Sequence, residues 1–109
     1  MDATPLIERI LEDEGITSGL EESEAALMVE LLTNKVREIA AGTNDAASAR
    51  QRVDALCRIA RRIARVVESF RDDGESKAKA MAEQVGLHWP DGARDSDALL
   101  RAFLEQTGI

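Results

Sequence analysis

The amino-acid sequence predicts an all-α fold, a helical bundle of about five helices in which residues 1–109 form a single domain. Alanine, glutamate, leucine and arginine, which favour helices, are the four commonest residues, while aromatic residues make up only 3% of the chain. Apolar residues recur at spacings of three and four along most of the chain, which is the helical period. Short glycine-containing breaks between these segments favour antiparallel neighbours in a bundle.

The first predicted helix covers residues 5–14. Thr4 is expected to cap it, because a hydroxyl oxygen can accept a hydrogen bond from one of the unpaired N–H groups at a helix start. Gly15 is expected to end it, as Gly108 is expected to end the last helix, since glycine adopts the left-handed conformation that closes many helices. The apolar stripe of this helix consists of Leu6, Ile7, Ile10 and Leu11.

Two long helices follow, over residues 20–41 and 45–71, and we expect them to form an antiparallel central pair. Ser18 or a neighbour is the expected N-cap of the first, and Asn44 or Thr43 is that of the second. The apolar residues of 45–71 occupy about half of the helix circumference, which is wider than the seam of a two-stranded coiled coil. We expect arcs of this width to leave apolar surface that a small bundle cannot cover, and that a partner could use.

Two shorter helices are predicted over residues 75–85 and 96–106, and together with the first helix they are expected to pack across the central pair. Gly86 is expected to end the former, and Asp95 or Ser96 to cap the latter. The predicted core consists of Leu6, Ile10, Leu11, Met28, Leu32, Val36, Ile39, Leu56, Ile59, Ile63, Val67, Phe70, Met81, Val85, Leu99, Phe103 and Leu104.

Charge is unevenly distributed along the chain, whose formal net charge is −7. Residues 1–24 carry eight acids and one arginine, whereas residues 44–71 carry seven arginines and three acids. A helical wheel of the third helix places four of these arginines together, opposite the apolar arc. This arginine face consists of Arg58, Arg61, Arg62 and Arg65.

Three interpretations of the arginine face compete. The one that we favour is a solvated face that pairs in part with the acidic N-terminal segment, in ion pairs that are individually weak. The second is the docking of an acidic partner or of a second copy of the chain. The third, nucleic-acid binding, is the least favoured, because a net charge of −7 opposes phosphate and only one helix is basic.

Trp89 is the single tryptophan and lies beside Pro90 in a loop. A tryptophan in such a loop usually anchors it on the core, and this is the interpretation that we favour. The alternative is an interface residue, since tryptophan is enriched among the residues that dominate binding energy.

Nothing in the sequence predicts a catalytic residue, a metal ligand or a cofactor. One cysteine, Cys57, and one histidine, His88, fall short of the four ligands of a structural zinc site. The carboxylate clusters do not have the spacing of a calcium loop, and no glycine-rich phosphate loop is present. We therefore expect a protein that is not an enzyme.

The sequence also suggests where the protein acts. It contains no signal peptide and no apolar stretch long enough to span a bilayer, and a single cysteine fits a reducing compartment, so we expect a cytoplasmic protein. Arginine outnumbers lysine 11 to 3 and alanine is abundant, which is typical of a GC-rich bacterial genome.

These observations predict a non-enzymatic helical domain for protein–protein interaction, an adaptor or regulatory module that binds a protein partner or self-associates, for example as a homodimer. The residues that we expect at the interface are those of the arginine face and Trp89. The alternative is a nucleic-acid-associated regulator that uses the arginine face.

Overall fold

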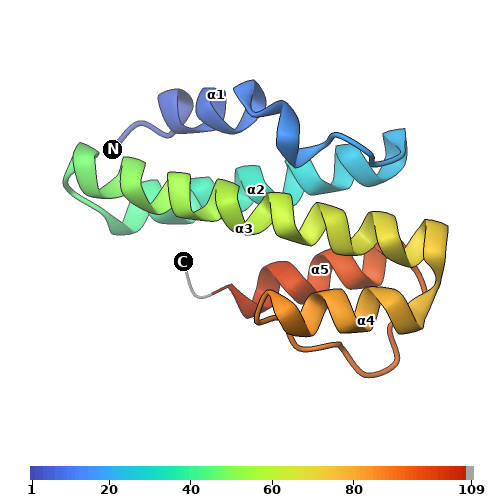
Figure 1. The fold of residues 1–109 in the computed structure, drawn as a ribbon. Coiled ribbons are helices and arrows are strands. Elements are labelled where there is room, and N and C mark those ends of the chain that lie inside the picture. The colour runs from blue at the N-terminus through green and yellow to red at the C-terminus, as the bar shows by residue number, and fades with distance from the viewer. Residues whose placement is uncertain (108–109) are drawn as a thin grey trace.

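The computed structural model describes residues 1–107 and contains five α-helices and one short 3₁₀ helix, with no strand in that range (Figure 1). The predicted all-α fold class is confirmed. The expected end of the last helix at Gly108 lies outside the described residues. The elements are α1 (Thr4–Glu12), η1 (Glu14–Ile16), α2 (Glu22–Gly42), α3 (Ala46–Asp73), α4 (Glu75–Gln84) and α5 (Ser96–Gln106).

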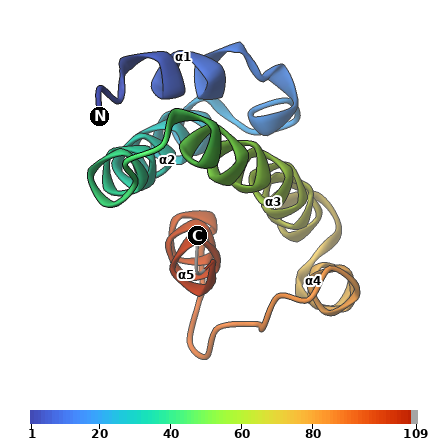
Figure 2. The same cartoon turned by 90° about the vertical axis from the view of Figure 1, so that its left-hand side faces the viewer.

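The longest helix, α3, runs the length of the molecule, whose principal extents are 42 × 24 × 19 Å. The chain reverses direction between α2 and α3, so that the two lie side by side. Figure 2 shows α1 on one side of this pair and α4 and α5 on the other. α1 and α5 contact both long helices, whereas α4 packs on α3. No helix within residues 1–107 is long and apolar enough to cross a membrane.

Most of the predicted core is buried in a single cluster. Ile59, Phe70, Met81 and Val85 are only partly buried, at the edge of the cluster. Leu11 was predicted wrongly, since it is 60% exposed. The predicted residues that are buried are Leu6, Ile10, Met28, Leu32, Val36, Ile39, Leu56, Ile63, Val67, Leu99, Phe103 and Leu104.

The error at Leu11 has a geometric cause. Leu6 and Ile10 are four residues apart and share the face of α1 that packs on the long helices. Leu11 lies about 100° further around the helix, and α1 has neighbours on one side only.

The expected surplus of apolar surface is absent from the described part of the chain. Its only exposed large apolar residues are Met1 and Leu11. The apolar arc of α3 is covered because α1, α2, α4 and α5 each pack on it. Small residues on that arc, including Cys57, Ala60 and Ala64, are completely buried.

The helix starts show which residues cap them. Asp95 caps α5 as expected, with its Oδ1 accepting from the N–H of Ala98 at 2.8 Å. Thr4 was predicted wrongly, because α1 begins with Thr4 itself, whose N–H donates to Asp2 Oδ1 at 3.0 Å. A carboxylate two residues ahead thus accepts from a free N–H at the helix start, as the threonine hydroxyl was expected to do.

The caps of the two long helices also differ from the prediction. Asp45 caps α3 in place of Asn44 or Thr43, and its Oδ2 accepts from the N–H of Ser48 at 3.1 Å. Hydrogen bonds from the hydroxyl and the N–H of Ser48 hold the pKa of Asp45 below its usual value. Ser18 does not cap α2. Its N-cap is Glu21, whose N–H donates to Glu24 Oε1 at 2.9 Å, so an acid-based capping box replaces the serine.

Gly86 closes α4, as expected, in a left-handed conformation with φ +81°. Its N–H donates to the Glu83 carbonyl at 3.2 Å, and the N–H of Leu87 donates to the Ala82 carbonyl at 2.9 Å. These are the two hydrogen bonds of a Schellman motif. The turn directs Leu87, which is buried, back towards the core.

Replacing Gly86 by alanine is expected to destabilise the protein by about 1–2 kcal/mol, because an L-residue is strained at a positive φ. The matched control is Gly42→Ala at the end of α2, where φ is not positive and an added Cβ meets no atom within 4 Å. That variant is expected to be neutral or stabilising by up to about 1 kcal/mol. Urea denaturation of both variants measures the difference, and equal effects would contradict the assignment.

Candidate functional site on the outer face of α3

The structure divides the arginine face into two pairs with different surroundings. Arg61 and Arg65 contact the connection between α1 and α2. Arg61 Nη2 lies 2.9 Å from Asp13 Oδ2, and an Nη of Arg65 donates to the carbonyl of Ser18. The favoured prediction, partial pairing with the acidic N-terminal segment, is therefore confirmed for Arg61.

Arg58 and Arg62 form the second pair. They are four residues apart, one helical turn, and both are exposed. Neither makes an ion pair or a side-chain hydrogen bond with any of residues 1–107, although the chain carries 21 acids and 14 bases. Two adjacent guanidinium groups are thus left to solvent in a protein with an excess of acids.

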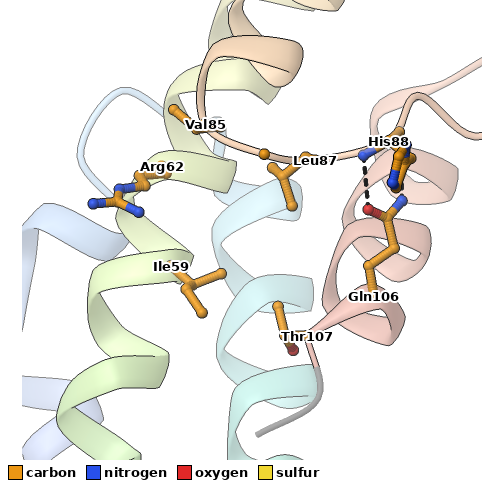
Figure 3. Close-up of a pocket in the computed structure, with 8 residues that line it drawn as sticks. Ile59, Arg62, Val85, Leu87, His88, Gln106 and Thr107 are labelled. Carbon is orange, nitrogen blue, oxygen red and sulfur yellow. Dashed lines mark hydrogen bonds between the residues drawn. The ribbon is translucent and has the colours of Figure 1, made fainter.

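A pocket of about 460 Å³ lies beside Arg62 (Figure 3). Three segments that are distant in sequence form it: the middle of α3, the end of α4 with the following loop, and the end of α5. No carboxylate lines it. The lining residues are Ile59, Arg62, Val85, Gly86, Leu87, His88, Gln106 and Thr107.

Hydrogen bonds between the segments hold this pocket in shape. The N–H of His88 donates to Gln106 Oε1 at 2.9 Å, and Gln106 Nε2 donates to the carbonyl of His88 at 2.6 Å (Figure 3). Thr107 Oγ1 donates to the carbonyl of Leu104 at 2.7 Å, and Lys35 Nζ lies 3.4 Å from the carbonyl of Thr107. The backbone and amide groups at this edge are therefore already paired within the chain.

Trp89 anchors the loop that follows α4, as the favoured prediction stated. Its ring centroid lies 5.8 Å from that of Phe70 in α3 and 6.0 Å from that of Phe103 in α5. The interplanar angles of 49° and 71° are those of tilted and edge-to-face aromatic pairs. All three aromatic residues of the chain thus meet in one cluster next to the pocket.

A second hollow, of about 220 Å³, lies between α2 and α5. Its ionisable lining residues are two bases, Lys35 and Arg101, and two acids, Glu38 and Glu105. The balanced charge gives it no preference for an anion or a cation, unlike the pocket beside Arg62.

Cys57 and His88 are not brought together. Cys57 and Ile59 are two residues apart on α3, so their side chains leave the helix about 200° apart, and only Ile59 lines the pocket with His88. Burial raises the pKa of the Cys57 thiol, which makes it a poor nucleophile near neutral pH. Within residues 1–107 no cluster of histidine, cysteine and carboxylate side chains could hold a metal ion.

A further ion-pair cluster lies at the end of α3 and the start of α2. Arg71 pairs with the Glu24 carboxylate, which is buried, and an Nη of Arg71 donates to the carbonyl of Gly19 at 2.7 Å. Hydrogen bonding to Asp72 and the charge of Glu24 raise the pKa of Arg71. Together with Arg61 and Arg65, Arg71 fastens the α1–α2 connection along one side of α3.

Comparison of the chain with protein-family models, with curated proteins and with solved structures finds no significant match.

The site contains residues that the sequence analysis did not select. Val85 and Leu87 lie at and just after the end of one predicted helix, and Gln106 and Thr107 at and just after the end of another, so their proximity depends on how α4 and α5 pack on α3. The helical wheel had placed Arg62 opposite the apolar arc, and the one available signal was its three-residue spacing from Ile59, which makes the two side chains neighbours on the surface of α3.

Glu24→Ala is expected to destabilise the protein by about 1–3 kcal/mol, because it removes a buried acceptor of the Glu21 N–H and of Arg71. Glu22→Ala is the matched control, since Glu22 lies in the same first turn of α2 but is exposed. The control is expected to change the free energy of unfolding by less than about 0.5 kcal/mol. Thermal and urea denaturation measure both, and a larger effect at Glu22 would refute the assignment.

The raised pKa of Cys57 predicts a loss of stability at alkaline pH. Below the unfolded pKa of about 8.5 the thiol is protonated in both states; above it the unfolded chain loses the proton first, which favours unfolding until the folded pKa is passed. The free energy of unfolding should therefore fall as the pH rises above about 8.5.

Denaturation at several pH values tests this expectation. The fall should be smaller in Cys57→Ala and in Cys57→Ser, whatever their stability at pH 7, because neither side chain titrates. If the free energy of unfolding falls as steeply with pH in both variants as in the wild type, groups other than Cys57 cause the fall.

Proposed function

We propose that this chain is a non-enzymatic helical protein-interaction domain, an adaptor or regulatory module, which contacts an acidic surface through Arg58 and Arg62. The observation that supports it is that these two exposed arginines have no partner within residues 1–107, whereas Arg61, Arg65 and Arg71 have one. Arginine is well suited to such contacts because its planar guanidinium binds carboxylates in a bidentate manner.

The acidic surface can belong to another protein or to a second copy of this chain. A second copy offers acids on the outside of α1, where Glu8 and Glu12 are exposed beside Leu11. The net charge of −7 opposes the approach of two copies at low salt, so another protein has the stronger support. Trp89 stays a predicted contact residue with less support, because much of its ring packs on Phe70 and Phe103.

The alternative function, a nucleic-acid-associated regulator, has less support. Arg61 and Arg65 contact the α1–α2 connection, which leaves two arginines to offset phosphate in an acidic protein. A cytoplasmic location is part of the proposal, and the single, buried thiol of Cys57 supports it.

The first experiment is sedimentation equilibrium of the purified chain over a wide concentration range at low and high salt. If self-association is the function, the wild type is expected to dimerise and the double variant Arg58→Glu/Arg62→Glu to remain monomeric. Arg94→Glu/Arg101→Glu is the matched control, since it makes the same change in charge at two exposed arginines away from α3.

If the chain is monomeric throughout, affinity capture with the same three proteins tests for another partner. The expected result is a partner that the wild type and the control retain and the Arg58→Glu/Arg62→Glu variant does not. Equal retention by all three, or nothing retained by any, would contradict the proposal. Salt-sensitive binding to DNA or RNA duplexes that only the Arg58→Glu/Arg62→Glu variant loses would favour the alternative.

A further inference from the structure

The pocket beside Arg62 has an aliphatic floor and a single permanent charge. Ile59, Val85 and Leu87 supply aliphatic carbon from α3 and from the end of α4. Arg62 lies at the edge, and its guanidinium points away from Leu87, His88 and Gln106, so that its charge is at the rim of the pocket and not inside it (Figure 3). The volume of about 460 Å³ lies within the range of small-molecule sites, which are mostly apolar with a few polar groups that orient the ligand.

The backbone, amide and hydroxyl groups at the Gln106 edge of the lining make their hydrogen bonds inside the protein. The backbone of His88 is paired with the Gln106 side chain, and the hydroxyl of Thr107 is paired with Leu104. A ligand rich in hydroxyl or amide groups would therefore meet few unpaired partners and would lose hydration without compensation. The exceptions are the guanidinium of Arg62 and the imidazole of His88, since neither has a side-chain partner within residues 1–107, and of the two only the guanidinium offers a planar pair of donors to a carboxylate.

We propose that this pocket binds a small aliphatic monocarboxylate, whose alkyl chain packs against Ile59, Val85 and Leu87 and whose carboxylate pairs with Arg62. The alkyl chain gains by leaving water for an aliphatic surface. One guanidinium balances one carboxylate, whereas a phosphate dianion would leave a negative charge uncompensated in a protein whose net charge is already −7. This binding needs no protein partner, and it therefore goes beyond the proposed function.

The probe is octanoate, titrated into the purified chain with 1-octanol, octylamine and acetate as comparison ligands. Amide chemical shifts in ¹H–¹⁵N spectra report the position of binding, and the fluorescence of Trp89, which follows His88 in the chain, gives a second signal. Saturable shifts at Gly86, Leu87 and His88 are expected with octanoate. Weaker binding is expected with 1-octanol and octylamine, and none with acetate.

Arg62→Gln is expected to weaken octanoate binding about two- to fivefold, the effect of one partly exposed ion pair, and to leave 1-octanol binding unchanged. Comparing the two ligands on the two proteins isolates the contact between the carboxylate and Arg62. Arg58→Gln is the matched control, because Arg58 is an exposed arginine one turn away that does not line the pocket. The Arg58→Gln variant should bind octanoate as tightly as the wild type does. The affinity of a protein partner that contacts both arginines would instead be reduced by either substitution.

A second variant tests the pocket itself. Val85→Phe places a larger side chain in the lining and is expected to reduce binding of octanoate and of 1-octanol alike, with the helical circular dichroism spectrum unchanged. If this variant does not fold, Ile59→Ala, which enlarges the lining at a partly buried position, should weaken both ligands.

Three results would overturn the proposal. The first is the absence of a saturable shift at Gly86, Leu87 and His88 with octanoate. The second is equal weakening of octanoate and 1-octanol by Arg62→Gln, since the carboxylate would then not contact Arg62. The third is tighter binding of the peptide acetyl-Ala-Ala-Leu with a free carboxylate than of octanoate, which would assign the pocket to a protein C-terminus instead.

Discussion

Burial of the apolar arc of α3 is the constraint on which the rest of the structure depends. α3 contacts every other helix, and residues such as Val53, Leu56 and Ile63 are completely buried. An arc that covers about half of a helix cannot be buried by one neighbour, because a single partner helix covers only a narrow stripe. The bundle therefore arranges α1 and α2 on one side of the arc and α4 and α5 on the other, and polar side chains are left to the remaining outer face.

The pocket is a consequence of that arrangement. α4 and α5 both pack on α3 but diverge from each other, and the loop after Gly86 crosses between them (Figure 2). The aliphatic edge of the α3 arc, at Ile59, is covered there by the loop and not by a helix. The same geometry separates the arginines, because Arg61 and Arg65 face the α1–α2 connection while Arg62 borders the pocket.

The helical period and the glycine breaks were sufficient to predict the fold class, the order of the helices and most of the core, because both are local properties of the chain. The caps were harder to predict. Asp2 accepts the hydrogen bond expected of Thr4, and Asp45 caps α3 in place of Asn44. In both cases the path of the backbone decides which side chain reaches the free N–H groups. The helical wheel treated the four arginines as one face, but the structure divides them, because whether each guanidinium has a partner depends on the chain that lies beside it. The pocket is formed by three segments that are distant in sequence, and a local sequence pattern cannot predict that they lie together.

Two of the contacts that fasten the α1–α2 connection use main-chain oxygens as acceptors, those of Ser18 and Gly19. A main-chain carbonyl is present whichever side chain the residue carries, so substitution of Ser18 leaves the acceptor for Arg65 in place. Position 19 has no such freedom, because its φ is +83° and a Cβ there would overlap the Glu68 carboxylate. Of these two neighbouring positions, therefore, the first tolerates any side chain that leaves the backbone path unchanged, whereas the second is restricted to glycine.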